Sequence, residues 1–138
     1  WAFVAVAAGG VVAAQAVLLG HESLGESNSA KAVAARLAAS MRPDVPFYSV
    51  QTYDQTLPFY FPGTVTLVDY RDEMDFGLTQ EPGLAVPDLA EFEDRWRRDA
   101  LAYALLAPGT HAHLASRGLP MTVLARDGRR VIVSNRPQ

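Results

Sequence analysis

Two acidic, tyrosine-bearing stretches carry the side chains best suited to chemistry, YDQTLPFYF at 53–61 and DYRDEMDFG at 69–77. A carboxylate accepts protons or hydrogen bonds from a substrate hydroxyl, and a tyrosine hydroxyl can donate or accept one. We therefore take Tyr53, Asp54 and Asp72 as candidates for contact with a substrate. The alternative is a structural role, in which Asp54 caps a helix beginning at Gln55 and the aromatic residues at 59–61 cover a sheet.

Other reactive patterns are missing from the sequence. It contains no cysteine, no Walker A loop and no GxGxxG motif, which excludes a thiol nucleophile and the familiar nucleotide-binding loops. His111 and His113 are two residues apart, so a helix would point them away from each other. The acidic residues at 69–75 are mixed with Arg71, a pattern more typical of a solvated loop than of a cation site. We expect no metal site, no cofactor and no catalytic residue within this chain.

The charge of the chain argues against a nucleic-acid partner. The 138 residues carry a net charge of -3, and the basic cluster at 95–98 is interleaved with acidic residues. Binding to phosphate backbones requires clustered Lys and Arg. The cluster at 95–98 is therefore interpreted as a solvated helix face.

The first 20 residues, WAFVAVAAGGVVAAQAVLLG, contain no charged side chain. A helix of this length would span roughly 30 Å, the thickness of the hydrocarbon core of a bilayer, so residues 1–20 are predicted to form a transmembrane helix. A signal peptide, or a buried strand and helix joined at Gly9 and Gly10, are the alternatives. Because the chain begins with Trp1 rather than Met, we expect it to be part of a longer protein.

A polar connector follows at 21–28, and a soluble domain is predicted over 29–138. Asn28 or Ser29 is expected to cap a helix over 30–42, with residues 30, 33, 34, 37 and 41 on its apolar stripe. Strands are predicted within 43–51, 64–70 and 100–107. Asp88 and Glu91 suggest a capping box that opens a helix over 88–99, in which Trp96 is a core residue.

The end of the chain predicts a short helix over 108–118 and a hairpin over 120–134, with Asp127 and Gly128 as a two-residue turn of positive backbone dihedrals. Strands separated by helices indicate an α/β fold, with a small mainly parallel sheet, helices on both faces and a C-terminal antiparallel hairpin. In such sheets, ligands bind at the carboxyl ends of the strands. Both acidic stretches follow predicted strands, so they should share that edge.

Several segments resemble the C-terminal portion of bacterial membrane glycosyltransferases of the aminoarabinose transferase family. The resemblance covers most of the chain from Gly20 onward and is strongest in SNSAKAVA, TYDQTLPFY and the RPQ ending. It implies a last transmembrane helix followed by a periplasmic domain at the bacterial inner membrane. The catalytic acid of the family lies in an early periplasmic loop that no position of this chain matches, so no catalytic residue is carried over.

The resemblance also implies a function. Enzymes of this family take a sugar from a polyprenyl-phosphate carrier and transfer it to lipid A or a related periplasmic acceptor. The implied partners are membrane lipid and the polyprenyl-phosphate-sugar donor, and a divalent cation is possible only in the membrane part that this chain lacks. This chain would then cover or support the active site and be inactive alone. The alternative function is a membrane-tethered, non-enzymatic α/β module that binds a sugar or peptide.

Overall fold

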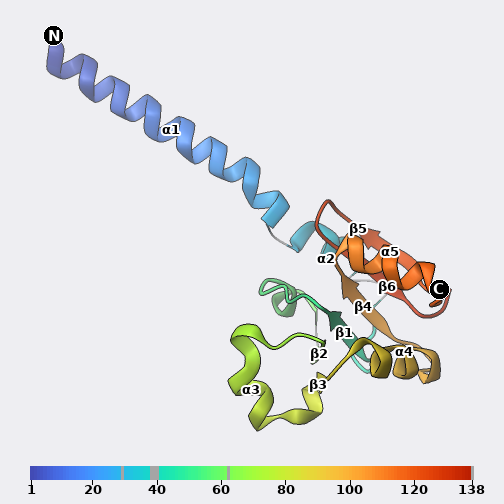
Figure 1. Cartoon of the computed structure of the whole chain (residues 1–138). Coiled ribbons are helices and arrows are strands. Elements are labelled where there is room, and N and C mark those ends of the chain that lie inside the picture. Colours follow the sequence, from blue (N-terminus) through green and yellow to red (C-terminus); the bar gives the residue numbers. More distant parts are fainter. Residues whose placement is uncertain (29, 38–40, 62, 138) are drawn as a thin grey trace.

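The computed structural model describes residues 1–28, 30–37, 41–61 and 63–137. Its centre is a six-stranded sheet of order β3-β2-β1-β4-β6-β5 (Figure 1). The strands are β1 (Phe47–Val50), β2 (Val65–Val68), β3 (Ala85–Val86), β4 (Tyr103–Leu106), β5 (Thr122–Arg126) and β6 (Val131–Ser134). The first four run parallel, whereas β6 pairs antiparallel with both β4 and β5. This confirms the predicted α/β class with its antiparallel C-terminal hairpin.

Helices and short 3-10 turns connect the strands. The helices are α1 (Ala2–Asn28), α2 (Lys31–Leu37), α3 (Asp75–Gln80), α4 (Leu89–Arg98) and α5 (Pro108–Ser116), and the 3-10 turns are η1 (Leu57–Phe59), η2 (Asp72–Met74) and η3 (Pro82–Leu84). The short elements between β2 and β4, including β3, were not predicted. Their apolar periodicity is too brief to stand out from a loop.

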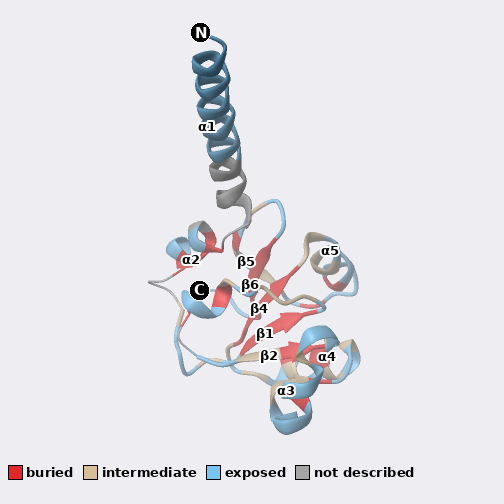
Figure 2. Cartoon of the chain, turned by 90° about the vertical axis from the view of Figure 1, so that its left-hand side faces the viewer, coloured by how far each residue is buried: buried red, intermediate tan, exposed pale blue. Residues whose placement is uncertain are grey.

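The first helix projects away from the sheet (Figures 1 and 2). Its span Ala2–Gly20 is long and apolar enough to cross a membrane, and none of that span is buried. The alternative prediction for these residues, a buried strand and helix of a soluble domain, is therefore wrong. The predicted linker at 21–28 is also wrong as a break in structure, because α1 continues to Asn28. No proline interrupts this segment, and extending an existing helix is easier than starting a new one.

One face of the sheet, which we call the α2 face, is covered by α2 and η1. The alanine and leucine stripe of α2 is buried as predicted, and it packs with Leu57 and Phe61 against Tyr103, Leu105 and Ile132. Phe47 and Phe61 stack with ring centroids 5.8 Å apart. Of the predicted helix over 30–42, the structure shows α2 over Lys31–Leu37, and Met41 has no helical assignment; residues 38–40 lie outside the described residues. The predicted cap at Ser29 lies outside the described residues.

The opposite face, which we call the α4 face, is covered by α4 and α5. Trp96 and Phe92 are fully buried there among the alternate side chains of β1, β4 and β6, which confirms Trp96 as a core residue. The indole Nε1 donates to the carbonyl oxygen of Pro120 at 2.7 Å. Asp88 caps α4 by accepting from the Glu91 amide at 2.9 Å. Buried residues therefore lie on both sides of the sheet (Figure 2).

The hairpin turn differs from its prediction. Neither Asp127 nor Gly128 has a positive φ angle. The turn has four residues, because the amide of Asp127 donates to the Arg130 carbonyl at 2.9 Å. Asp127 Oδ1 also accepts from the amides of Arg129 and Arg130, each at 2.7 Å. The aspartate side chain thus closes the turn that the Asp-Gly pair was expected to close by backbone conformation alone.

The exposure of α1 predicts how the two parts of the chain behave in solution. A chain beginning at Ser27 keeps both core clusters and loses the apolar span, so it should be monomeric and soluble without detergent. The whole chain should aggregate unless detergent is present. Size-exclusion chromatography of both chains checks this, and detergent-free solubility of the whole chain would contradict it.

Burial of Tyr48 predicts an alkaline limit to stability. Desolvation, together with the hydrogen bond from its hydroxyl to Asp99 at 2.8 Å, raises the pKa of Tyr48 to about 12. The neutral phenol is the form favoured by folding, so its contribution is complete below about pH 10, the ordinary pKa of tyrosine, and is lost as the pH rises towards 12. Urea unfolding at pH 8 to 11 should show a smaller loss of stability for Tyr48→Phe than for the parent. Equal slopes would contradict this assignment.

Candidate functional site

The carboxyl edge of the sheet contains a topological switch point. From β1 the chain moves to β2 and β3 on one side, and then returns to place β4 on the other side of β1. Such switch points are where open α/β sheets bind ligands. The site lies between the ends of β1 and β4, where a small polar cavity of about 60 Å³ is present. It is lined by Thr52, Tyr53, Asp54, Leu105, Leu106, Arg129 and Arg130.

Asp54 is held on both of its carboxylate oxygens. Its Oδ1 accepts from the backbone amide of Thr56 at 2.9 Å and from the Thr56 hydroxyl at 2.6 Å. Its Oδ2 accepts from Nε of Arg130. The predicted helix beginning at Gln55 is absent, and the carboxylate closes the turn that leads into η1. The prediction that Asp54 caps a helix is therefore wrong: Thr56 directly precedes η1, and Asp54 stabilises the turn before it.

Arg130 is a buried cation between two carboxylates. Its side chain is 5% exposed and pairs with Asp54, which is 12% exposed, and with Asp127 at 2.9 Å. Burial opposes ionisation of Asp54, but hydrogen bonds from Thr56 and Arg130 outweigh it and hold the pKa of Asp54 below its ordinary value. The pKa of Asp127 is lowered in the same way, against burial, by hydrogen bonds from Arg129 and Arg130.

A chain of hydrogen bonds leads from Asp54 to the start of α2. The Thr56 hydroxyl, which donates to Asp54, accepts a hydrogen bond from the backbone amide of Ala30 at 2.9 Å. Ala30 directly precedes α2. The first backbone amides of a helix have no hydrogen-bond partner within the helix, and the Ala30 amide is one of them. Asp54 therefore links three parts of the chain that are distant in sequence, namely the hairpin turn, η1 and the start of α2. We call Asp54, Thr56, Asp127 and Arg130 the Asp54 cluster.

The neighbouring strand ends carry a second set of polar contacts. Gln51 and Asp69 directly follow β1 and β2, and both have left-handed backbone conformations with φ angles of 53° and 48°. The Gln51 side-chain amide donates to Asp69 Oδ2 at 2.7 Å, and the Thr110 hydroxyl on α5 lies 3.4 Å from Gln51 Oε1. Non-glycine residues of this conformation are uncommon. The side chains of Gln51, Asp69 and Thr110 therefore hydrogen-bond to one another at the ends of β1 and β2 and the first turn of α5.

The three predicted site residues do not converge on one point. Tyr53 reaches the switch-point cavity and lies near Tyr70, with ring centroids 6.5 Å apart, so the two acidic stretches do share the carboxyl edge. Asp54 is directed into the buried cluster. Asp72 lies on η2, exposed to solvent and with a φ angle of 31°. The geometry joins Tyr53 to Asp54 but does not join Asp72 to either.

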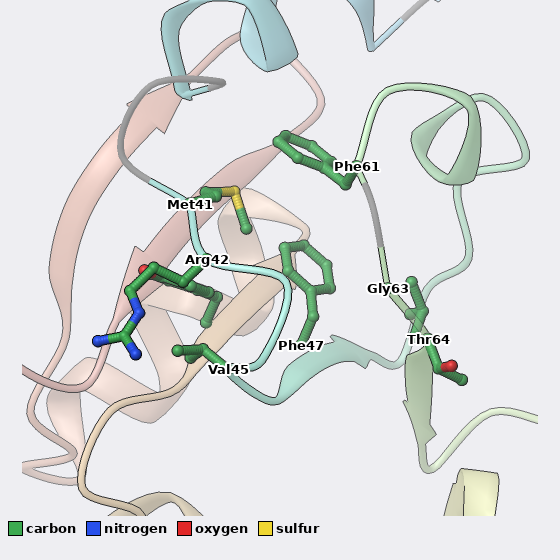
Figure 3. A pocket seen from close by; sticks show the side chains of 9 residues that line it. Met41, Arg42, Val45, Phe47, Phe61, Gly63 and Thr64 are labelled. Atoms are coloured by element: carbon green, nitrogen blue, oxygen red, sulfur yellow. The ribbon is translucent and has the colours of Figure 1, made fainter.

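A separate hollow on the α2 face is too small to be a ligand site. It holds about 20 Å³ and is bounded by Met41, Phe47 and Phe61, while the Arg42 guanidinium points away from it (Figure 3). That volume suits one water molecule. Gly63 at its edge has a φ angle of 124°, and a side chain there would meet the Pro43 carbonyl at 3.4 Å. This region is packing around the start of β1.

Reasoning from sequence missed the partners of Asp54. Its ionic partner Arg130 is more than 70 positions away in the sequence, and Asp127 contacts Arg130 and not Asp54. An arginine directly before the apolar strand VIVS was the available signal. Among the described residues, no group of three His, Cys, Asp or Glu side chains could hold a metal ion.

Comparisons with known proteins give the relationship of the chain. Residues 33–135 match the protein family described as aminoarabinose transferase C-terminal domain. The crystal structure of ArnT from Cupriavidus metallidurans in the apo state superposes with a TM-score of 0.79 at 41% sequence identity, over 88% of this chain and 23% of that one. The structure of the same protein bound to undecaprenyl phosphate gives the same values. No curated protein sequence matches. The chain thus spans about a quarter of the length of these solved chains.

The Asp54 cluster predicts a defined pattern of stability. Asp54→Ala leaves Arg130 with one carboxylate and Thr56 without an acceptor, which should lower the free energy of unfolding by about 3 kcal/mol. Asp54→Asn keeps an acceptor for Thr56 and should cost less, about 1 to 2 kcal/mol. Urea unfolding of a chain beginning at Ser27 measures both, with the exposed Asp94→Asn as the control.

The loss from Asp54→Asn should also depend on pH. The pKa of Asp54 is lowered by folding, so its stabilisation is complete above about pH 4, the ordinary pKa of aspartate. It is lost as the pH falls through the lower, folded value. The difference between parent and Asp54→Asn should therefore shrink below pH 4, and a constant difference from pH 7 to 3 would contradict the ionised cluster.

Proposed function

We propose, since the chain belongs to the aminoarabinose transferase C-terminal domain family, that it is the last membrane helix and C-terminal domain of a glycosyltransferase. The enzyme would transfer a sugar from a polyprenyl-phosphate carrier to lipid A or a related periplasmic acceptor. The observation that carries this proposal is the structural match to the C-terminal part of ArnT, which was crystallised with undecaprenyl phosphate.

The proposed location is the bacterial inner membrane, with the α/β domain on the periplasmic side. The apolar span of α1 supports this placement, because all of it lies outside the core of the domain. Its many alanine and glycine residues suit close packing against other membrane helices, where backbones approach one another. Membrane lipid and the lipid-linked donor are the partners that follow from this proposal.

We infer that the domain covers or supports the active site and contributes no catalytic group. Transfer to an acceptor hydroxyl requires a base, together with a cation or basic groups for the departing phosphate. Asp54 suits neither role, because its two oxygens are occupied and its pKa is lowered, which makes the carboxylate a weak base. Arg130 is already neutralised by two carboxylates. Any divalent cation of the enzyme would belong to the membrane part outside this chain.

Tyr53 is the predicted site residue best placed to contact an acceptor. It is half-buried and lines the polar switch-point cavity as well as a larger apolar groove on the α2 face. Asp72 is exposed at some remove along the same edge. We propose contact with the acceptor for Tyr53, and a structural role for Asp54.

This function predicts two results for sugar transfer. The chain described here should show no transfer from a polyprenyl-phosphate donor, because it lacks the family's catalytic loop. In the full-length enzyme, Asp54→Asn should retain activity in proportion to the amount of folded protein. Tyr53→Phe, which removes only the hydroxyl, provides the matched variant at the adjacent position. A stable but inactive Asp54→Asn enzyme, or transfer by this chain alone, would contradict the proposal.

A further inference from the structure

Exposed basic side chains collect at the end of the domain next to α1. Lys31 and Arg36 lie on α2, Arg126 ends β5, and Arg129 lies in the β5–β6 turn. The two elements are neighbours, because the buried stripe of α2 packs against the buried Ala125 of β5. We call the four basic residues and the surface they share the basic end.

The Asp54 cluster places the basic end close to the apolar span of α1. It joins the β5–β6 turn to the amide of Ala30, two residues beyond the end of α1. The apolar span ends at Gly20 and α1 ends at Asn28, which is a rise of about 12 Å along a helix. The headgroup layer on each side of a bilayer is about 5 to 8 Å thick. If α1 spans a membrane, the basic end therefore begins just outside the headgroups.

The acidic side chains gather at the other end of the domain. In both views α2 and the β5–β6 turn lie next to α1, whereas α3 and α4 lie at the far end (Figures 1 and 2). The segment formed by η2, α3 and η3 contains one basic residue, Arg71, among the carboxylates of Asp72, Glu73, Asp75 and Glu81. The charge of the domain is thus uneven, with its positive end towards the apolar span.

Two arginines of the basic end lack an acidic partner. Among the described residues, neither Arg36 nor Arg126 belongs to an ion pair. Arginines on the far side of the domain are paired instead, namely Arg71 with Asp75, Arg95 with Glu91, and Arg97 and Arg117 with Glu93. A guanidinium group that is exposed and not neutralised by a carboxylate is suited to bidentate binding of phosphate.

We propose that the basic end binds the phosphate groups of anionic lipids at the membrane surface. The inference rests on the membrane placement of α1 in the proposed function. Residues 21–28 add two carboxylates, Glu22 and Glu26, and Asp127 in the turn is paired with Arg130, so the four basic residues leave this end positive. Such a surface is attracted to anionic headgroups, whereas the acidic end around α3 is repelled by them. Lipid charge would therefore orient the domain with α3 away from the bilayer.

Fluorescence quenching by labelled headgroups tests the inference on the whole chain. The chain contains no cysteine, so a single fluorophore can be attached at a chosen position. Gly128→Cys places it in the β5–β6 turn and Gly83→Cys places it in η3 at the far end, and at both positions an added Cβ meets no atom within 4 Å. The chains are reconstituted in vesicles of phosphatidylcholine, with or without about 30% phosphatidylglycerol, each containing the same amount of quencher-labelled lipid.

Quenching at position 128 should be about twofold stronger in the anionic vesicles, because the basic end is drawn to their surface. The increase should disappear when salt is raised from about 0.1 M to 1 M, which shortens the Debye length from about 10 Å to 3 Å. Position 83 should show no increase in either salt. Equal quenching of position 128 in the two kinds of vesicle would overturn the inference.

Substitutions identify the side chains that make the contact. Arg36→Gln combined with Arg126→Gln should abolish the increase at position 128. The matched control, Arg71→Gln combined with Arg98→Gln, removes the same charge from exposed positions at the far end and should keep the increase. An increase that survives the first pair, or is lost equally in the control pair, would contradict the assignment.

Two further measurements separate the possible sources of failure. Inorganic phosphate at about 10 mM and constant ionic strength should leave the increase unchanged, because a single ion cannot match many headgroups on one surface. Loss of the increase would assign the surface to soluble phosphate and overturn the lipid. Failure of the chain to float with either vesicle would refute the membrane placement together with this inference. Absence of sugar transfer by the full-length enzyme, with the increase intact, would refute the proposed function and leave the basic end standing.

Discussion

The buried interaction of Asp54 with Arg130 and Thr56 is the contact on which the arrangement of this domain depends. Through Arg130 it fixes the β5–β6 turn, and through Thr56 it reaches the amide of Ala30 at the start of α2. The start of α2 is thereby tied to the segment that follows β1 and to the β5–β6 turn. A buried cation left without one of its carboxylates is costly, so loss of Asp54 should weaken the connection to the turn as well as the one to α2.

This constraint changes the interpretation of the carboxyl edge. A switch point in an α/β sheet is the usual place for a ligand. Here both carboxylate oxygens of Asp54 accept hydrogen bonds from Thr56 and Arg130. The side chains of Gln51 and Asp69 are likewise hydrogen-bonded to each other. The chemically available side chain at this edge is instead Tyr53, which lines both the polar cavity and the apolar groove beside β2.

Much of this organisation was predictable from local patterns. Alternating strands and helices predicted the α/β class, the spacing of Phe92 and Trp96 predicted a buried helix face, and the uncharged run predicted α1. The turn at Asp127 and the partners of Asp54 were not predictable, because a contact between Asp54 and Arg130 depends on how β6 is placed beside β4. The short β3 and α3 carried too little periodicity. The family resemblance was confirmed, whereas the roles of Tyr53, Asp54 and Asp72 stay predictions.

A double-mutant cycle between Asp54→Asn and Arg130→Met tests the central claim most directly. Asn at 54 keeps an acceptor for Thr56, and Met at 130 keeps much of the side-chain volume, so the cycle isolates the ionic contact. Urea unfolding at pH 7 of a chain beginning at Ser27 should give a coupling free energy of about 2 kcal/mol, with the double variant less destabilised than the sum of the single variants. Additivity within about 0.5 kcal/mol would show that the two side chains do not act as a unit and would contradict this account.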